Sequence, residues 1–489
     1  PAPIKNVGLL MLDSKLPLPS SRQPLWALHQ LGLYRSVAEL AAREQAAVKQ
    51  RELAAAAASC AALGRSQDAE KHFRRLLKHP LSRWYRRRQI AIALAPHAPD
   101  LALRWLEETR REGKDDCADL WVALLCGLGR YGEAARLLPR AKTAFPDQPE
   151  LRLHEANLQR LGKLAAGAEG EEAMLACLAG YFEHYGLEPP LPRNDALPLS
   201  AANARAKAGA GSHQGPLVSV IMTAYDTGER IDYALRSLLA QTHGNLEILV
   251  MDDASGDDLG AVVARLKQED PRIRYFRLPR NVGTYVAKEL ALRYLARSDF
   301  VTCHDSDDWS HPRKIELQLK ALLQDPRRVF SWSYWLRVQD DGLIVARQSH
   351  PLLRPNLSSV LFRREAVLDR AGGYDQVRTG ADSEFLARLQ LVFGRQAGAR
   401  LRLPLAFGAL RAGSLMTDGV TGIGAGTSTT PFRLAYWEAW RHWHLACQQQ
   451  GRRPRMPERP ADRPYPIPEG QAAEPGPDLL AALWRQSEG

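Results

Sequence analysis

The chain has 489 residues, too many for one ordinary domain, so its length predicts two or three domains. Its 45% hydrophobic and 25% charged residues are typical of a folded globular protein, and no stretch approaches the roughly eighteen apolar residues that a membrane span needs. The formal net charge of +11 suits an anionic partner without choosing among nucleic acid, a membrane face and a phosphorylated substrate. The six cysteines show no metal-ligand spacing, so no zinc site is predicted.

The beginning of the chain predicts no exported leader. A short apolar run, VGLLML at residues 7–12, follows the single basic residue Lys5 and is not followed by a small-residue cleavage pattern. We therefore expect a cytoplasmic protein that lies at most peripherally at the inner face of the cytoplasmic membrane.

Residues 1–186 predict a helical domain with an internal repeat. This part is rich in Ala, Leu, Arg and Glu, and the pair Leu-Gly recurs at residues 31–32, 63–64, 128–129 and 161–162, with intervals of 32, 65 and 33 residues. Small Ala69 and Ala134 follow two of the glycines by five residues, which lets a second helix approach the first closely. The unit is similar to the tetratricopeptide repeat, whose period is about 34 residues, and a plain irregular helical bundle remains the alternative. A repeat domain of this kind would dock a protein partner.

Two segments have the composition of connecting chain. Residues 187–216 begin with prolines and end with small residues and glycines, which predicts a linker. Residues 448–489 are rich in proline and arginine, which predicts a disordered tail. Within that tail, LLAALWRQ at residues 479–486 has the pattern of one short docking helix.

Between these segments, residues 217–447 alternate between strand-like and helical patterns. Buried-strand runs lie at 217–224, 246–252, 273–278 and 300–304, and amphipathic helical runs lie between them at 229–241, 259–268 and 284–296. This alternation predicts βαβ units and a parallel sheet with helices on its faces. In such sheets, ligands bind beyond the carboxyl ends of the strands.

Polar residues gather at those strand ends. They are Thr223, Tyr225 and Asp226 after the first strand, Asp252 and Asp253 after the second, Arg280 and Asn281 after the third, and Asp305, Asp307 and Asp308 after the fourth. No GxGxxG or GxxxxGK[ST] loop follows any of these strands, which argues against dinucleotide and P-loop sites. Neighbouring carboxylates are tolerable beside a divalent cation, and Mg²⁺ or Mn²⁺ binds a few carboxylates together with waters and substrate phosphates. An Asp-x-Asp motif alone is weak evidence, because it occurs by chance on many surfaces.

The order of segments over residues 216–420 resembles the family 2 glycosyltransferases of the GT-A fold. The segments that carry the resemblance are VSVIMTAYDTGERIDYALRSLLAQTHGNLEILVMDDASGDD, RNVGTYVAKELAL, DSDDW and GADSEFLARL. The resemblance implies an α/β domain, in which a mainly parallel sheet is flanked by helices. It also implies a hexosyltransferase that moves a sugar from a nucleotide-sugar, expected to be a UDP-sugar, without identifying that sugar.

The resemblance implies a nucleotide site at the ends of the first three strands. Its residues are Thr223, Tyr225, Asp253, Arg280, Asn281 and Gly283. By analogy with the family, the first three lie beside the nucleotide base, and the other three belong to an RNVG loop that helps to close the site.

The same resemblance gives Asp305 and Asp307 the role of the family's metal-binding D-x-D. A divalent metal, Mn²⁺ or Mg²⁺, would then stabilise the negative charge of the departing diphosphate. We expect Asp308 to assist through a water or through the N-terminus of the following helix.

An inverting transfer also needs a carboxylate that takes the proton of the acceptor hydroxyl. Asp382 occupies the position of the aspartate in the family's Glu-Asp motif, although Ala381 stands where the family has the glutamate. Glu384 is the rival base, and a helix-capping role for Asp382 is the structural alternative. Further on, LRAGSLMT at 410–417 is similar to the family's C-terminal lid, in which Arg411 could reach the diphosphate or lie at the surface.

Together these features predict a metal-dependent, inverting glycosyltransferase that acts on a glycan or lipid-linked glycan acceptor in cell-surface polysaccharide or lipopolysaccharide synthesis. The alternative is a tetratricopeptide-like scaffold with an inactive transferase domain, because Ala381 replaces the usual glutamate. Binding of nucleic acid ranks last, since no basic stripe is interleaved with aromatic residues.

Overall fold

The structure, a computed structural model, describes residues 24–43, 49–79, 85–110, 116–163, 170–207, 209, 211–346, 350–410, 430–473 and 476–487. The chain divides into two compact units. The first, called the helical unit, comprises the described residues within Pro1–Pro189, Leu343–Leu352 and Arg411–Leu434. The second, called the α/β unit, comprises those within Pro190–Gly342, Leu353–Leu410 and Ala435–Gly489.

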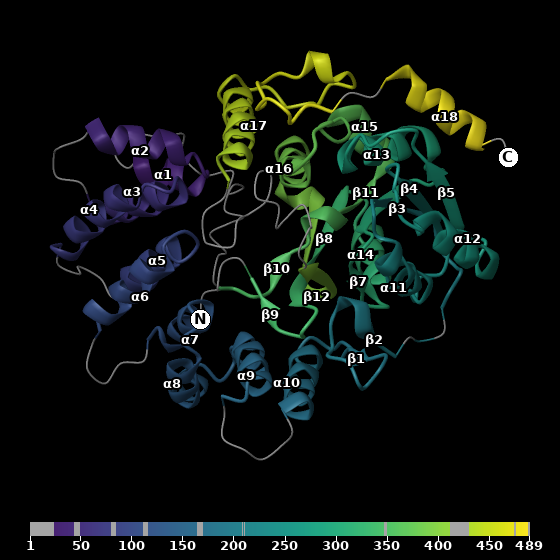
Figure 1. Cartoon of the computed structure of the whole chain (residues 1–489). Helices are drawn as coiled ribbons and strands as arrows, with labels where there is room; N and C mark the ends of the chain where they lie inside the picture. Colours follow the sequence, from purple (N-terminus) through teal and green to yellow (C-terminus); the bar gives the residue numbers. More distant parts are fainter. Residues whose placement is uncertain are drawn as a thin grey trace. The chain divides into compact units, whose positions relative to one another are not determined.

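Helices make up most of the helical unit (Figure 1). In chain order the described helices are α1 (Pro24–Gln30), α2 (Tyr34–Arg43), α3 (Gln50–Ala62), α4 (Ser66–Leu77), α5 (Tyr85–Leu94), α6 (Pro99–Glu108), α7 (Ala118–Gly127), α8 (Tyr131–Ala144), α9 (Glu150–Arg160) and α10 (Gly170–Glu183). Consecutive helices pack in pairs, among them α3 with α4, α7 with α8 and α9 with α10. The short strand β9 (Ile344–Val345) also belongs to this unit, and Asn157 of α9 hydrogen-bonds both the N–H and the carbonyl of Ile344.

The repeated Leu-Gly pairs mark the turns inside these helix pairs. Gly64 has a φ of +74° and Gly129 a φ of +72°, a left-handed conformation that glycine adopts without the Cβ strain of other residues. At the first turn, the N–H of Gly64 donates to the carbonyl of Ala61, and the N–H of Arg65 donates to the carbonyl of Cys60. This Schellman pattern ends a helix and lets the chain reverse. Ala69 and Ala134 are both buried, so the predicted close helix packing is confirmed.

The sheet of the α/β unit has the strand order β5-β4-β3-β6-β11-β8-β12-β7. The strands are β3 (Val218–Ala224), β4 (Leu246–Asp252), β5 (Ile273–Arg277), β6 (Phe300–Asp305), β7 (Trp309–Ser310), β8 (Phe330–Gln339), β11 (Leu361–Arg363) and β12 (Gly398–Leu410), with β10 (Arg354–Pro355) beside β8. Pairing is parallel among β5, β4, β3 and β6 and between β8 and β12, and antiparallel where β11 and β7 join. The predicted α/β class with a mainly parallel sheet after an all-helical region is confirmed.

Helices lie between these strands in the chain: α11 (Gly228–Leu239), α12 (Leu259–Glu269), α13 (Thr284–Leu290) with a π-helical turn at Ala291–Leu295, α14 (Lys314–Leu323), α15 (Arg364–Arg370) and α16 (Ala381–Phe393). After the last strand come α17 (Pro431–Gln449), whose first four residues belong to the helical unit, and α18 (Pro477–Ser487). Every residue of β3 and β4 is buried, which is why both strands read as continuous apolar runs. The predicted linker contains the short antiparallel strands β1 (Leu191–Pro192) and β2 (Ala204–Arg205).

The C-terminal segment differs from the predicted disordered tail. Residues 452–473 pack against the rest of the α/β unit, where the Nε of Arg463 donates to the buried carboxylate of Asp375 at 2.7 Å. The predicted docking helix exists as α18, and its Gln486 accepts from the N–H and donates to the carbonyl of Arg277 on the edge strand β5. Disorder was expected because the segment has few apolar residues. The structure instead holds it through buried polar contacts, which composition does not reveal.

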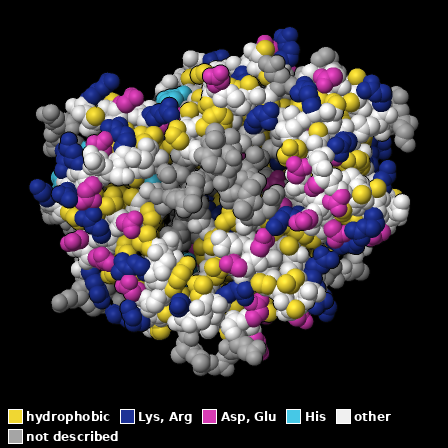
Figure 2. Space-filling model, in the orientation of Figure 1, with side chains coloured by type: hydrophobic (Ala, Val, Ile, Leu, Met, Phe, Trp, Pro, Cys, Tyr) yellow, Lys and Arg dark blue, Asp and Glu magenta, His cyan; other side chains and the backbone are white. Residues whose placement is uncertain are grey.

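Apolar side chains fill the interiors of both units, and none of the helices within the described ranges combines the length and apolarity needed to cross a bilayer. On the face that Figure 2 shows, Lys and Arg side chains lie among Asp and Glu side chains. The positive net charge is therefore mixed with acidic groups on that face.

Candidate active site

The carboxyl ends of three neighbouring parallel strands form the predicted site. Thr223, near the end of β3, pairs in register with Asp305 at the end of β6 and with Met251 on β4. The hydroxyl of Thr223 lies 2.6 Å from the hydroxyl of Thr284, the first residue of α13. The sheet order thus brings a predicted nucleotide residue and a predicted metal ligand side by side.

Asp253 anchors the RNVG loop. The N–H of Val282 donates to its Oδ1 at 2.7 Å, and the N–H of Gly283 donates to its Oδ2 at 2.8 Å. Burial raises the pKa of Asp253 to about 6, although these two backbone donors act in the opposite direction. Gly283 has a φ of +88° and precedes α13, so the loop turns into that helix at a position suited to glycine.

The other predicted nucleotide residues lie at the edge of this arrangement. Tyr225 is 51% exposed. The carboxamide oxygen of Asn281 accepts from the guanidinium of Arg378 at 3.2 Å, and the exposed Arg280 lies 3.4 Å from the carboxylate of Asp478 on α18. The structure therefore brings Thr223, Asp253, Asn281 and Gly283 together, whereas Tyr225 and Arg280 face solvent and the C-terminal helix.

Asp305 is a partly accessible carboxylate beside a buried cation. Its side chain is 32% exposed, and its Oδ1 lies 3.5 Å from the Nζ of Lys288, whose side chain is 2% exposed. Burial would raise the pKa of Asp305, but Lys288 and a hydrogen bond from Ser358 outweigh it and hold that pKa below its usual value. Asp305 is therefore ionised at neutral pH.

Asp308 turns toward the interior. It is 4% exposed, and its Oδ1 accepts from the N–H of Ala409 on β12 at 3.0 Å. Its pKa lies well above the usual value because it is buried and because Asp305 and Asp307 are close. The buried Lys314 is close to Asp308. Burial lowers the pKa of Lys314 to about 8, and the carboxylate of Asp308 acts in the opposite direction. Asp308 is thus tied to β12, and its expected assistance at the metal stays a prediction.

The residues at the end of β6 fit a divalent cation that is shared with a substrate. Asp305 and Asp307 offer the carboxylate oxygens that Mg²⁺ and Mn²⁺ prefer, and the hydroxyl of Tyr233 donates to the carbonyl of Asp307 at 2.9 Å, which fixes the turn. In the part of the chain that the structure describes, no three His, Cys, Asp or Glu side chains are grouped as a closed protein cage would require. Two carboxylates suffice where waters and a diphosphate complete the coordination.

Asp382 lies in the first turn of α16, after Gly380, which has a φ of +85°, and the fully buried Ala381. Its Oδ1 accepts from the N–H of Ser383 at 2.8 Å. Burial lowers the pKa of Lys288, but Asp305, Cys303 and, to a smaller extent, Asp382 raise it by more, so that this pKa lies above its usual value. The ion pair of this ammonium is with Asp305, the predicted metal ligand.

Glu384, the rival base, is engaged elsewhere. It is fully buried, and its Oε1 accepts from the Nε of Arg388 at 2.8 Å and lies 3.0 Å from the Nε2 of His444. Burial alone would raise the pKa of Glu384, but Arg388 and His444 lower it to about 2. This carboxylate is therefore a structural anion that ties α16 to α17.

Sequence reasoning missed Lys288 as a site residue. The pattern TYVAKELAL predicts an amphipathic helix in which the lysine is exposed to solvent. Its place four residues after Thr284 puts both on one face of α13, and Thr284 contacts the end of β3. That spacing was the available signal, and it becomes informative once β3 and β6 are known to be neighbours.

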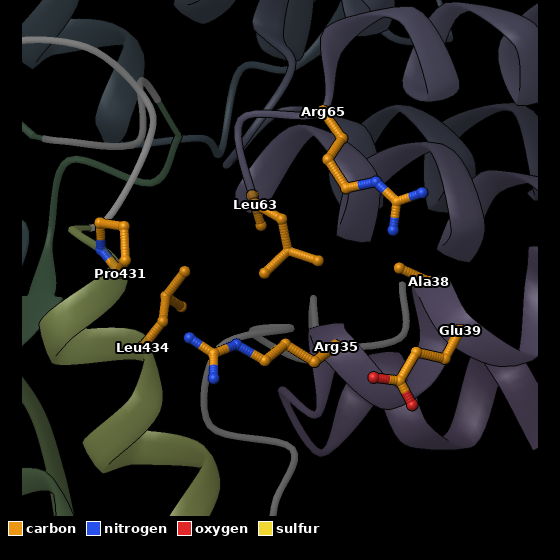
Figure 3. Close-up of a pocket in the computed structure, with 8 residues that line it drawn as sticks. Arg35, Ala38, Glu39, Leu63, Arg65, Pro431 and Leu434 are labelled. Carbon is orange, nitrogen blue, oxygen red and sulfur yellow. The ribbon is translucent and has the colours of Figure 1, made fainter. Parts of the chain in front are cut away.

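Other features lie apart from this constellation. The predicted lid from Arg411 to Thr417 lies outside the described residues. A pocket of about 300 Å³ belongs to the helical unit (Figure 3), and it contains none of the predicted site residues. Its lining residues are Arg35, Ala38, Glu39, Ala62, Leu63, Arg65, Pro431 and Leu434.

Comparisons with known proteins match the central part of the chain. Residues 219–383 match the family model described as glycosyl transferase family 2. An uncharacterized glycosyltransferase of Rickettsia felis is 36% identical over 125 residues, which cover 26% of this chain and 20% of the relative. The chondroitin synthase of Pasteurella multocida is 32% identical over 134 residues, which cover 27% of this chain and 14% of the relative. The chain thus spans a fifth or less of the length of these two relatives.

Among solved structures, S. aureus TarS 1–349 in complex with UDP-GlcNAc aligns with 19% identity and a TM-score of 0.35, over 40% of this chain and 59% of that one. The family match covers β3, β4, β5 and β6 and ends at Ser383, so it includes the D-x-D and Asp382. The chain therefore contains a glycosyltransferase family 2 domain at residues 219–383, preceded by a helical N-terminal region.

Proposed function

We propose that this protein is a metal-dependent, inverting hexosyltransferase that moves a sugar from a UDP-sugar to a glycan or lipid-linked glycan acceptor in cell-surface polysaccharide or lipopolysaccharide synthesis. The observation that carries the proposal is the position of the D-x-D at the carboxyl end of β6, beside Thr223 of β3, within the segment that matches glycosyl transferase family 2. An inverting transfer needs two carboxylate centres, one beside the leaving group and one beside the acceptor. The name of the chondroitin synthase relative supports a glycan product.

On the leaving-group side, Asp305 and Asp307 would hold Mn²⁺ or Mg²⁺. When bound, the metal supplies a Lewis acid that stabilises the charge on the departing diphosphate. Asp305 contributes an ionised carboxylate at neutral pH, because Lys288 holds its pKa low. The main-chain carbonyl of Asp307 is fixed by Tyr233, which keeps the second carboxylate at the end of the strand.

On the acceptor side, Asp382 would take the proton of the attacking hydroxyl. As that oxygen forms its bond to the anomeric carbon, the bond from this carbon to the diphosphate breaks, and its electron pair leaves with the diphosphate. Attack from the face opposite the leaving group inverts the anomeric configuration. The N–H of Ser383 holds one oxygen of Asp382, which orients the carboxylate.

The nucleotide would bind over the ends of β3 and β4. In this proposal Thr223, Tyr225 and Asp253 lie beside the base, and Arg280, Asn281 and Gly283 close the site. What supports this assignment is the contact of Asp253 with the RNVG loop, because one carboxylate ties the strand end to the loop.

The helical unit would bind a protein partner or position the acceptor. We also propose a cytoplasmic location with at most peripheral attachment to the inner membrane face, where the net charge of +11 suits anionic lipid headgroups.

The test is a screen of donor turnover with the full chain, using UDP-, GDP- and TDP-sugars with Mn²⁺, with Mg²⁺ and with EDTA. The proposal expects metal-dependent release of nucleoside diphosphate from a UDP-sugar. If no donor is turned over in a metal-dependent way, the scaffold alternative is favoured. That alternative arises because Ala381 stands in place of the family's glutamate.

A further inference from the structure

The chain after α17 crosses the loop that leads into α16. We define residues 452–473 as the C-terminal strap and residues 375–379 as the base loop, because Asp382 follows that loop by three residues. Between Val377 of the base loop and Ala472 of the strap lies an antiparallel bridge. Four of the five residues of the base loop are at most 5% exposed. This loop is therefore enclosed, and the strap supplies part of the enclosure.

Asp375, at the start of the base loop, is a buried carboxylate with donors from the strap and from α17. The Nε of Arg463 donates to its Oδ1 at 2.7 Å, and the hydroxyls of Tyr465 and Tyr436 donate to its Oδ2 at 2.7 and 3.0 Å. Arg463 also donates to the carbonyl of Gln376 at 3.1 Å. A buried carboxyl group needs such partners, so the strap fixes this end of the loop.

Gln471 fixes the other end. Its Nε2 donates to the carbonyl of Thr379 at 2.6 Å, and its own main-chain carbonyl accepts from the N–H of Arg378 at 3.1 Å. Gln471 is fully buried, so water cannot replace these hydrogen bonds without local opening. The backbone of Arg378 and Thr379 is thereby set immediately before the left-handed Gly380.

The base loop also connects the two halves of the candidate site. The guanidinium of Arg378 donates to Asn281 in the RNVG loop, and Gly380 and Ala381 lead directly to Asp382. Asp253 holds the RNVG loop independently through Val282 and Gly283, so movement of Arg378 should displace the predicted base more than the nucleotide loop.

Residues on either side of the base loop have separate restraints. Arg388 of α16 donates to the carbonyls of Ala371, Gly372 and Gly373 and is paired with Glu384. These contacts of Arg388 do not involve the strap, although the N–H of Met456 in the strap also donates to the carbonyl of Ala371 at 2.8 Å. Loss of the contacts of Gln471 and Arg463 should therefore loosen residues 375–379 while α16 and the sheet stay folded.

We propose that the C-terminal strap is a positioning element of the transfer reaction, in which Gln471 and Arg463 hold the base loop so that Asp382 points at the acceptor hydroxyl. This inference rests on the proposed function, since it assigns a task to the loop that carries the proposed base. Both residues act through the base loop and are positioning residues.

The experiment compares Gln471→Leu and Arg463→Met with Arg459→Met in the full chain. Arg459 is a matched control, because it belongs to the same strap, is exposed and pairs only within it, with Asp462. The measurements are kcat and KM for the UDP-sugar that the wild type turns over with Mn²⁺, the Kd for UDP with Mn²⁺, and hydrogen exchange of the amides of residues 375–383.

We expect Gln471→Leu and Arg463→Met to lower kcat about tenfold or more, since small displacements of a catalytic group have large effects on rate, while KM and the Kd for UDP change less than about twofold. Exchange at residues 375–383 should rise in both variants, exchange in β3 and β4 should not, and Arg463→Lys should restore part of the rate.

Unchanged kcat or unchanged exchange in Gln471→Leu, with an active wild type, would overturn this inference and leave the proposed function standing. A wild type without metal-dependent turnover would overturn the proposed function and the inference with it. If Arg463→Met does not fold, Gln471→Leu, which replaces a neutral side chain by one of similar size, decides alone.

Discussion

Buried charge is paired differently in the helical unit and at the end of β6. In the helical unit, Asp119 is 3% exposed and accepts two hydrogen bonds of 2.6 Å from Arg88. Burial works against the ionised form of Asp119, but Arg88 outweighs it, so the pKa of this carboxyl falls below its usual value. The charge is matched inside the protein, and this pair needs nothing from outside.

At the end of β6 the charges do not close into such pairs. Asp305 keeps a low pKa and remains partly accessible, whereas neighbouring Asp308 has a pKa well above its usual value. The same unit also contains a closed cluster, Glu384 with Arg388 and His444. A carboxylate that the protein leaves incompletely matched is available to an external cation, and a matched one holds the fold together.

The largest effect should come from Asp382→Asn. This change removes the proposed base and keeps the shape, so we expect kcat to fall about 10²- to 10⁴-fold. The Kd for UDP with Mn²⁺ should stay within about twofold, because the proposed mechanism places Asp382 on the acceptor side. Steady-state kinetics and calorimetry measure the two quantities. Near-normal transfer by this variant would remove Asp382 from the mechanism.

Asp307→Ala tests whether the carboxylates at the end of β6 bind a metal ion. Loss of a metal ligand should weaken Mn²⁺-dependent UDP binding by at least about 10²-fold. Even the loss of a residue that only hydrogen-bonds to a ligand lowers metal affinity about 10- to 100-fold. Calorimetric titration of UDP with and without Mn²⁺ gives the comparison. Equal metal dependence in wild type and variant would mean that Asp307 is not a ligand.

Arg88→Met tests the matched pair in the helical unit. It leaves Asp119 buried without its partner, and such losses destabilise proteins by about 3 to 5 kcal/mol. The control is Arg130→Met, because Arg130 pairs with the exposed Glu133 and exposed pairs contribute at most about 1 kcal/mol. Urea unfolding of the three proteins measures the difference. Equal destabilisation by both changes would contradict the distinction between matched buried and exposed pairs.

Glu384 gives the closed cluster a pH signature. Its folded pKa of about 2 lies below the ordinary value of 4.5, so its contribution to stability is complete above about pH 4.5 and is lost as the pH falls toward 2. The contribution is roughly 3 kcal/mol. In Glu384→Gln, the free energy of unfolding should depend less on pH over this range. Parallel curves for wild type and variant would show that Glu384 is not held ionised.

The smallest expected effect concerns the turns of the helical unit. Gly64→Ala places a Cβ at a φ of +74° and should destabilise the protein by about 1 to 2 kcal/mol. Gly132→Ala is the control, because Gly132 lies within α8 with open space around its Cβ, and alanine should leave stability equal or raise it by up to about 1 kcal/mol. Thermal unfolding distinguishes the signs, and destabilisation by both would contradict the turn assignment.

Features set by local sequence were predictable. The Leu-Gly turns depend on residues next to one another, and the fully buried strands β3 and β4 appear as unbroken apolar runs. The positions of Thr223, Asp253 and Asp305 at strand ends follow from the same alternation. The roles of these residues came from the resemblance to the family. They cannot be derived from the alternation of strands and helices.

Features set by distant contacts were not predictable. Lys288 meets Asp305 only through the strand order, and Asp308 faces β12 because the turn after β6 directs it inward. The strap was misjudged for the same reason, since Arg463 and Asp375 are 88 residues apart in the chain. A composition rich in proline and arginine does not reveal which buried carboxylate those arginines will meet.

The contact between Gln486 and Arg277 affects how much of the edge strand β5 is open to other chains. The main chain of an edge strand is a template for pairing with another strand, and α18 occupies that template on β5 with a side-chain amide. At Arg277, α18 therefore occupies main-chain groups that another strand could otherwise use. A truncated chain that ends after β12 would keep the strands from β3 to β12 but would lack α18. The outer edge of β5 would then be uncovered at Arg277.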